Sequence, residues 1–233
     1  MAFSSLSDPI ANRLAQQLSI VSKRWNLRPV DVVDGAILWL GWTGLTWLAF
    51  LLSLLFVEIG ETGEVLWLEA WLGGSLIGAC QWLVLRAYLR GSYRWMVATV
   101  VSWSVLCLLH LGAVGWVAPG TPNLLLRGVF GVLYGSYVGL GLGLGQWWAM
   151  RAQVTQAWRW VPLSAGIWAM SIAVAWILGG LLRLVSGLFM GEVLGLVMGW
   201  GAIAALSGIG IVGLLYDQRS IPPVHPQAEH WPH

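Results

Sequence analysis

The chain has 233 residues, of which 58% are apolar and only 9% carry a charge. Typical globular domains carry about 25% charged residues, so this composition excludes an ordinary soluble domain and indicates a membrane protein. The formal net charge of +2, with no basic cluster, excludes a nucleic-acid-binding surface.

Residues 1–34 are predicted to form a cytoplasmic or interfacial segment with an amphipathic helix over 8–25. Ser7 or Asp8 can cap this helix, and Pro9 suits its first turn. Its apolar residues recur every three or four positions on one face: Ile10, Leu14, Leu18, Val21 and Trp25. The helix lies either on the membrane surface or against the loops of the bundle. No cleavable signal peptide is expected, because no early apolar run precedes a small-residue cleavage site.

Six apolar stretches follow, each near the roughly 20 residues that cross a bilayer. They cover 35–57, 65–88, 95–118, 124–149, 160–182 and 188–215. The weakest of the short breaks between them is the turn around Arg183 and Gly187. The sequence therefore predicts an all-α fold, a polytopic bundle of six transmembrane helices over 35–216 embedded in a lipid bilayer. The polar, proline-containing tail over 217–233 is expected to be disordered and cytoplasmic.

Lysine and arginine residues predict the orientation of the bundle. Ten of the 12 lie before the first stretch, in the second and fourth breaks, or in the tail. The opposite side carries Arg127 and Arg183, together with Glu58, Glu61 and Glu64. Because short cytoplasmic loops are enriched in Lys and Arg, both termini are predicted to be cytoplasmic, in a cell inner membrane.

Two hairpins of the chain coincide without a gap when the sequence is shifted by 65 residues. The matched pairs are Gly74–Gly139, Gly78–Gly143, Gln81–Gln146, Arg86–Arg151, Arg94–Arg159, Trp95–Trp160 and Trp103–Trp168. The hairpins, about 65–118 and 124–182, are predicted to be a parallel repeat about an axis along the membrane normal. The sixth stretch either pairs with the first as a degenerate third hairpin or stands outside the repeat.

The motif Gly-x-x-x-Gly-x-x-Gln-Trp-x-x-x-Arg, followed by Arg-Trp, resembles a group of multi-pass bacterial membrane proteins that is common in cyanobacteria. The resemblance covers about residues 74–168, and the glycine-rich stretch 188–215 is also similar to that group. Related segments in the group are also appended to soluble signalling domains. The resemblance implies a membrane domain, with the thylakoid membrane as an alternative location, and it implies no established activity.

Regularly spaced glycines are the predicted packing residues of the bundle. They are Gly74, Gly78, Gly135, Gly139, Gly143, Gly191, Gly195 and Gly199. Stripes of small residues let helix backbones approach closely in a membrane. The contact is expected either within one tight bundle or between copies of the chain.

Paired polar residues of the two hairpins are candidates for a ligand site. Gln81 shares a helix face with the glycines before it, as Gln146 does in the second hairpin. The two amides are expected to approach each other or to cap backbone carbonyls, as structural contacts or as a polar ring at the inner mouth of a cavity. Arg86 and Arg151 end their helices, where they anchor to headgroups or bind an anionic headgroup or substrate.

His110 is the only histidine within a predicted span, and the repeat places Ala175 opposite it. Intramembrane ionisable residues are functional candidates by default. Its imidazole is a candidate ligand of haem or chlorophyll, or a proton relay. The alternative is a structural hydrogen bond to Tyr134 or Tyr137.

Two further groups of side chains lie within or at the ends of the predicted spans. The matched indoles Trp103 and Trp168 lie deep in the bilayer, where they line a site for a flat apolar ligand or fill the core. Charged residues near the outer helix ends are expected to form an ion-pair cluster or a substrate gate: Glu69, Arg127, Arg183 and Glu192.

The sequence contains no Ser-His-Asp set, phosphate loop, paired intramembrane carboxylates or metal-ligand spacing, so a non-enzymatic protein is expected. Cys80 and Cys107 lie in apolar stretches and are interpreted as small hydrophobic residues. The leading hypothesis is a protein that binds a hydrophobic ligand, a partner membrane protein or a second copy, in an assembly or stabilising role. The alternative is a small-solute transporter, which needs a polar site at the bilayer midplane.

Overall fold

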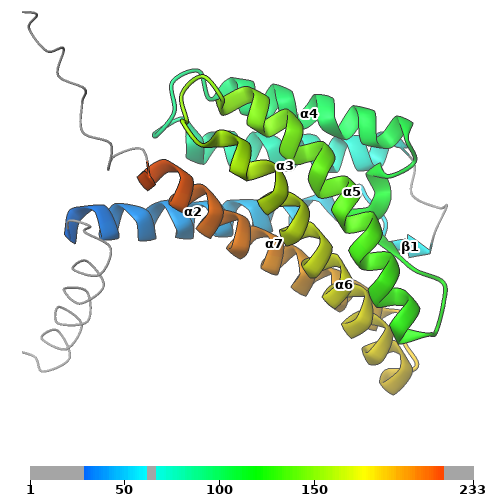
Figure 1. Cartoon of the computed structure of the whole chain (residues 1–233). Helices are drawn as coiled ribbons and strands as arrows, with labels where there is room; N and C mark the ends of the chain where they lie inside the picture. Colours follow the sequence, from blue (N-terminus) through cyan, green and yellow to red (C-terminus); the bar gives the residue numbers. More distant parts are fainter. Residues whose placement is uncertain (1–28, 62–66, 218–233) are drawn as a thin grey trace, which may run out of the picture.

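The computed structural model describes residues 29–61 and 67–217, which form six long helices joined by short connections (Figure 1). The helices are α2 (Pro29–Ser53), α3 (Trp67–Leu85), α4 (Tyr93–Leu108), α5 (Leu124–Met150), α6 (Trp160–Ser186) and α7 (Met190–Asp217). A short 3-10 helix, η1 (Gly112–Gly115), precedes the strand β2 (Val117–Ala118). A second one, η2 (Ala157–Arg159), precedes α6. Strand β2 pairs in parallel with β1 (Gly60–Glu61). The predicted all-α class is confirmed for the described chain.

The helices form a closed ring. Each helix packs against the next one along the chain, and α2 packs against α7. One end of the ring carries the connections 86–92 and 151–159, and we call it the arginine end. The other end carries residues 54–61, 109–123 and 187–189, and we call it the Glu192 end.

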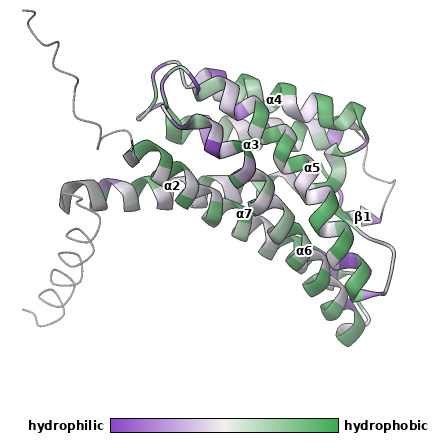
Figure 2. Cartoon of the chain, in the orientation of Figure 1, coloured by the Kyte–Doolittle hydropathy of each residue, from purple (hydrophilic) through white to green (hydrophobic). Residues whose placement is uncertain are grey.

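Five of the described helices are long and apolar enough to cross a membrane, namely α2, α3, α5, α6 and α7. Figure 2 shows apolar residues along most of each helix, as expected for a multi-pass membrane protein. Helix α4 is also apolar but has only 16 residues. At a rise of about 1.5 Å per residue it falls short of a hydrocarbon core of about 30 Å.

The third apolar stretch, 95–118, was expected to be helical throughout, and this is wrong for its second half, because α4 ends at Leu108. His110 adopts a left-handed conformation with φ of 58°. Its N–H donates to the carbonyl of Cys107, and the N–H of Leu111 donates to the carbonyl of Leu106. These two hydrogen bonds, with a left-handed residue between them, form a Schellman motif that stops the helix.

Residues 112–118, which follow α4, are mostly buried without forming an α-helix, and tryptophan side chains bind two of their carbonyl groups. Trp200 Nε1 donates to the carbonyl of Gly115, and Trp176 Nε1 donates to that of Val117, both at 2.8 Å. Trp116 is fully buried, and its indole N–H reaches Ser53 Oγ at 2.9 Å. Irregular backbone at membrane depth is tolerated where protein buries it, and these indoles provide the acceptors with partners.

Helices α2, α4 and α6 share a pattern of core residues. The internal match at a shift of 65 residues relates only α4 and α6 of these three helices. Each has a Trp, then Thr or Ser four residues later, then Trp or Phe four residues after that. The three sets are Trp42, Thr46 and Phe50; Trp95, Thr99 and Trp103; and Trp160, Ser164 and Trp168. None of the nine is more than 6% exposed. Spacing by four places each set on one helix face, so the three helices present matching layers to the core.

Helix α2 is held to α7 by three indole N–H groups. Trp39 donates to the carbonyl of Ala205 at 2.9 Å, Trp42 to Ser207 Oγ at 2.8 Å and Trp47 to the carbonyl of Val197 at 3.0 Å. These bonds close the ring between the first and the last of the described helices.

Besides the end of α4, the predicted boundaries differ from the structure at the start of the bundle. The interfacial segment was expected to extend to residue 34, but α2 already begins at Pro29, a residue suited to the first helical position. The amphipathic helix over 8–25 and almost all of the tail 217–233 lie outside the described residues.

Candidate functional site

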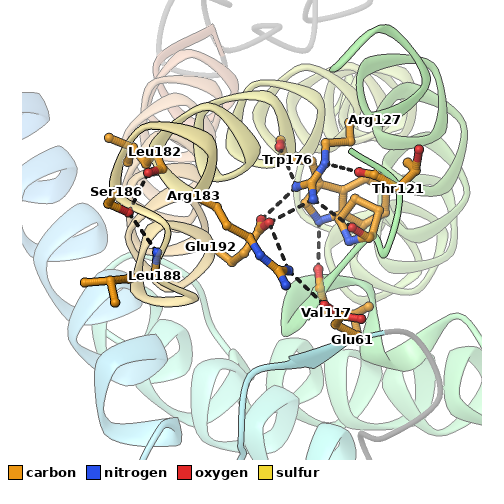
Figure 3. A network of polar contacts seen from close by, with 11 residues as sticks. Glu61, Val117, Thr121, Arg127, Trp176, Leu182, Arg183, Ser186, Leu188 and Glu192 are labelled. Carbon is orange, nitrogen blue, oxygen red and sulfur yellow. Dashed lines mark hydrogen bonds and ion pairs between the residues drawn. The ribbon is translucent and has the colours of Figure 1, made fainter. Parts of the chain in front are cut away.

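The Glu192 end contains a network of charged side chains from three helices (Figure 3). Arg127 lies one turn into α5, Arg183 lies in the last turn of α6, and Glu192 lies in the first turn of α7. Asn123 caps α5 by accepting from the backbone N–H groups of Leu125 and Leu126, at 3.0 and 3.2 Å. This cap fixes where α5 starts and thus the depth of Arg127.

Arg127 and Glu192 form a buried ion pair, with side chains only 3% and 1% exposed. Nη1 and Nη2 of the arginine donate to the two carboxylate oxygens at 2.7 and 2.8 Å, a bidentate arrangement. Breaking such a pair by removing one partner leaves an uncompensated buried charge, which is strongly destabilising.

The remaining donors of Arg127 bind three backbone carbonyls. Nε donates to Thr121 at 2.6 Å, Nη1 to Trp176 at 3.1 Å and Nη2 to Pro119 at 2.9 Å. A guanidinium group has five N–H bonds, so together with Glu192 every donor has an acceptor. Arg127 is thus a structural centre that ties the 119–121 loop to α6 and α7, and it has no donor left for a ligand.

Two consecutive glycines of α6 make room for this ion pair. A Cβ at Gly179 would lie 2.8 Å from Oε2 of Glu192, and a Cβ at Gly180 would lie 2.9 Å from the Arg127 guanidinium. Real Cβ atoms essentially never approach another heavy atom so closely. The Gly179-Gly180 pair is therefore part of the site, although spacing alone did not distinguish it from the other glycines.

A second, more exposed ion pair adjoins the first. Arg183 Nη1 lies 2.8 Å from Oε1 of Glu61 and 3.7 Å from Oε1 of Glu192. The side chains of Arg183 and Glu61 are 39% and 45% exposed. The guanidinium of Arg183 also lies over the ring of Phe189, with 5.4 Å to the centroid.

An open cleft of about 460 Å³ lies beside these arginines. It is lined by Gly120, Pro122, Arg127, Gly180, Arg183, Leu184 and Gly187. Arg127, Arg183 and Glu192 were expected to form an outer cluster, and they are in one network. Glu69 takes no part in the network that Figure 3 draws, and Glu61, which sequence reasoning used only for orientation, does.

The arginine end has a different polar arrangement, built from three indole N–H groups. Trp95 donates to Gln81 Oε1 at 3.0 Å and Trp160 donates to Gln146 Oε1 at 2.8 Å. Both bonds join residues 14 positions apart in matched hairpins. A third indole, Trp42 of α2, donates to Ser207 Oγ of α7 at 2.8 Å. Because an indole N–H can only donate, each glutamine turns its oxygen toward the tryptophan.

Gln81 and Gln146 were expected to pair with each other or to cap backbone carbonyls, and the structure shows neither. Each accepts from an indole, and Gln146 also donates to Thr99 Oγ1 at 3.2 Å. Tight packing is the physical reason, because the ring of Trp160 lies against that of Trp95, 5.7 Å between centroids, and fills this layer.

Arg86 and Arg151 are exposed at the arginine end, just beyond α3 and α5. The guanidinium of Arg151 lies over the rings of Trp147 and Trp148, at 5.7 and 5.8 Å from their centroids. This placement suits side chains that anchor a helix at a membrane surface.

Trp103 and Trp168 lie in contact, with their ring centroids 6.0 Å apart. Trp103 also packs on Trp116, and Trp168 packs edge-on against Trp200. The two deep indoles thus meet within a cluster of aromatic rings, in which they contact other side chains of the same chain.

His110 was expected inside a spanning helix, but it lies outside α4, in the turn that follows it. The residue is exposed and caps the end of α4. It was misplaced because the apolar run of the sequence continues past it to Ala118, which hid the end of the helix.

The glycines singled out from the sequence lie at close helix contacts. A Cβ at Gly74 would overlap the ring of Trp103, and one at Gly78 would lie 3.1 Å from Thr99. In the second hairpin, Gly139 and Gly143 face α6 in the same way, at Ser164 and the residues around it. A Cβ at each of the others, Gly135, Gly191, Gly195 and Gly199, would also collide with atoms of the neighbouring helix.

Comparison with family models, with curated proteins and with solved structures gives no match for this chain.

Proposed function

We propose that this chain is a non-enzymatic membrane domain that associates with a partner membrane protein, either a different one or a second copy, in an assembly or stabilising role. The observation that carries the proposal is the exposure of Tyr137 in the middle of α5. This residue is the fourteenth of the 27 residues of α5 and is 57% exposed on the outside of the ring.

A tyrosine hydroxyl group at this position needs a partner. In the middle of a spanning helix it lies about 15 Å from either edge of the hydrocarbon core, beyond the reach of the side chain. Within the described residues no hydrogen bond satisfies it. Lipid tails offer neither a donor nor an acceptor, and an unsatisfied polar group there costs free energy. A helix of another protein can supply the missing bond.

The surroundings of Tyr137 form a continuous exposed face of α5. Residues with the same orientation are exposed along its length: Leu133, Leu140, Leu144 and Trp148. Tyr134, 42% exposed, extends the face with a second hydroxyl group. An apolar stripe interrupted by hydroxyl groups is suited to packing against another membrane helix.

The interior of the ring supports this proposal over a ligand site or a transport path. Phe50, Trp103, Trp116, Trp168 and Trp200 pack against one another in the core. A transporter needs polar groups at its midplane. Here the middle of the core is occupied by aromatic rings.

A photoreactive amino acid at position 137 tests the proposal in living cells. We expect a covalent protein adduct after illumination. The matched control is Met198, which is 56% exposed on α7, a helix that does not neighbour α5 in the ring. If position 137 yields adducts with lipid alone, or no more protein adduct than position 198, the α5 face is a lipid-facing surface and the proposal is wrong.

We also propose that the chain crosses the membrane six times, with both termini in the cytoplasm of a bacterial cell and the membrane being the inner or thylakoid membrane. Helix α4 and the buried segment after it would together make the third crossing. The arginine-rich connections at one end of the ring support this orientation. Reporter fusions at Gly120 should read external, and fusions at Arg90 or Gln156 internal; an internal signal at Gly120 would reverse the orientation.

The internal repeat, and with it the resemblance to cyanobacterial hairpin proteins, belongs to the same proposal. Equivalent indole bonds at Gln81 and Gln146 support the parallel hairpins. The bond from Trp42 to Ser207, with the shared pattern on α2, supports α7 and α2 as the degenerate third pair. The domain is then a ring of three helix pairs with approximate threefold symmetry.

A further inference from the structure

Arg183 is the charged group through which the cleft at the Glu192 end can bind a ligand. Its contacts with Glu61 and Glu192 are both made by Nη1. A guanidinium group carries three more N–H bonds on Nε and Nη2. These have no acceptor within the described part of the chain, whereas every donor of the neighbouring Arg127 is occupied.

The cleft around this side chain combines charge with apolar surface. Its volume, about 460 Å³, lies within the roughly 300–1,000 Å³ of typical ligand sites. Gly120, Gly180 and Gly187 contribute to its walls, and Pro122 and Leu184 make part of its lining apolar. It lies at the ends of α5 and α6, the level at which lipid headgroups meet a spanning helix.

The two carboxylates near Arg183 differ in how readily a bound anion can displace them. Glu192 is buried and held by two hydrogen bonds from Arg127, so it stays in place. Glu61 is 45% exposed, and exposed ion pairs are weak. An anion that enters the cleft can therefore take the place of the Glu61 carboxylate. The planar fork of an arginine matches the oxygens of a phosphate group.

We propose that this cleft binds a phosphate group, with Arg183 as its charged contact and Glu61 as the carboxylate that it displaces. The phosphate group is either part of an anionic lipid headgroup or a free inorganic phosphate ion. The apolar lining at Pro122 and Leu184 fits the lipid, whose glycerol and acyl carbons would lie along it.

Thermal unfolding of the full, detergent-solubilised chain measures this binding. Phosphatidylglycerol is titrated into the protein in one arm, phosphatidylcholine in the second and inorganic phosphate in the third. A ligand that binds only the folded state raises the melting temperature in a concentration-dependent way. We expect a rise with phosphatidylglycerol that phosphatidylcholine does not reproduce; an equal rise with inorganic phosphate identifies free phosphate as the ligand.

Three variants distinguish the cleft from general attraction to anionic lipid. Arg183→Gln should raise the half-saturating concentration at least about tenfold, because it removes charge-assisted hydrogen bonds. Glu61→Gln should lower it, because it removes the competing carboxylate. Arg86→Gln changes an exposed arginine at the opposite end and should leave it unchanged.

The opposite signs expected for the two partners of one ion pair make the test sharp. If the Arg183–Glu61 pair were merely structural, either substitution would disturb the cleft. Both would then change the half-saturating concentration in the same direction. If Arg183→Gln does not fold, the Glu61→Gln titration still decides the question. No response to any of the three probes, or an equal loss in Arg86→Gln, overturns the proposal.

Discussion

The guanidinium group of Arg127 and the carboxylate of Glu192 face each other through two parallel hydrogen bonds of 2.7 and 2.8 Å, although 65 residues separate them in the chain. The pair joins the start of α5 to the start of α7 across α6. Its three further bonds to backbone carbonyls make it the point at which three helices and a loop are fixed together.

Substituting Glu192 by Gln should destabilise the protein by about 3–5 kcal/mol, because it leaves the Arg127 charge buried without a counter-charge. The double variant Arg127→Met/Glu192→Met should lose less stability than the sum of the losses in Arg127→Met and Glu192→Met. Chemical denaturation in detergent measures all four variants. Strict additivity of the two losses would show that the residues do not act as a pair. Glu61→Gln, in the exposed pair, serves as the control and should change stability little.

Gly139→Ala should destabilise the bundle by about 1–3 kcal/mol, since the new methyl group would lie 2.6 Å from the carbonyl oxygen of Ser164 and force α5 and α6 apart. Gly166→Ala is the matched control, because a Cβ at this α6 glycine meets nothing within 4 Å. There the better helix propensity of Ala should stabilise the protein by up to about 1 kcal/mol. Equal melting temperatures for the two variants would contradict the α5–α6 packing.

Gln146→Met should cost more stability than Gln81→Met. Gln146 serves two partners, Trp160 and Thr99, whereas Gln81 accepts one bond, from Trp95. Hydrogen bonds between membrane helices average about 0.6 kcal/mol, so the difference should be of that order. Parallel unfolding curves of the two variants test this, and a larger loss at Gln81 would show that the indole bonds are not equivalent.

His110→Gly should leave the protein as stable as before or stabilise it by about 1 kcal/mol, because glycine adopts the left-handed conformation without strain. His110→Leu should cost stability without changing the visible absorbance of protein purified from its native membrane. The same pair of variants tests the haem or chlorophyll hypothesis: loss of a bound pigment in both would establish His110 as its ligand.

Composition and apolar run length were enough to predict the helical class and the approximate extent of α2, α3, α5, α6 and α7, because burial in lipid demands long apolar segments. The end of α4 was not predictable in this way. The stretch 109–118 is as apolar as a span, yet it leaves the helix, and the carbonyls of Gly115 and Val117 accept hydrogen bonds from indoles of α7 and α6. The signals that remain in the sequence are Gly112 and Gly115, which interrupt this run.

The sequence was enough to predict which charged residues lie close together, but the contacts between them could not be predicted from it. Arg127, Arg183 and Glu192 fall near the same ends of their predicted helices, so their proximity follows from topology. The bidentate pair, the role of Gly179 and Gly180, and the entry of Glu61 depend on how three helices are rotated about their axes. The same limit hid the contact between Trp42 and Ser207, because these residues are 165 positions apart and meet only when the ring closes.

Closure of the ring between α2 and α7 also sets an order of events during biosynthesis. Trp39, Trp42 and Trp47 of α2 leave the ribosome long before their acceptors, which lie 150 to 166 residues later. Until α7 is inserted, these indole N–H groups face lipid or the insertion machinery without their final partners. A nascent chain that stalls before α7 therefore lacks the acceptors of all three indoles, and its ring stays open at α2.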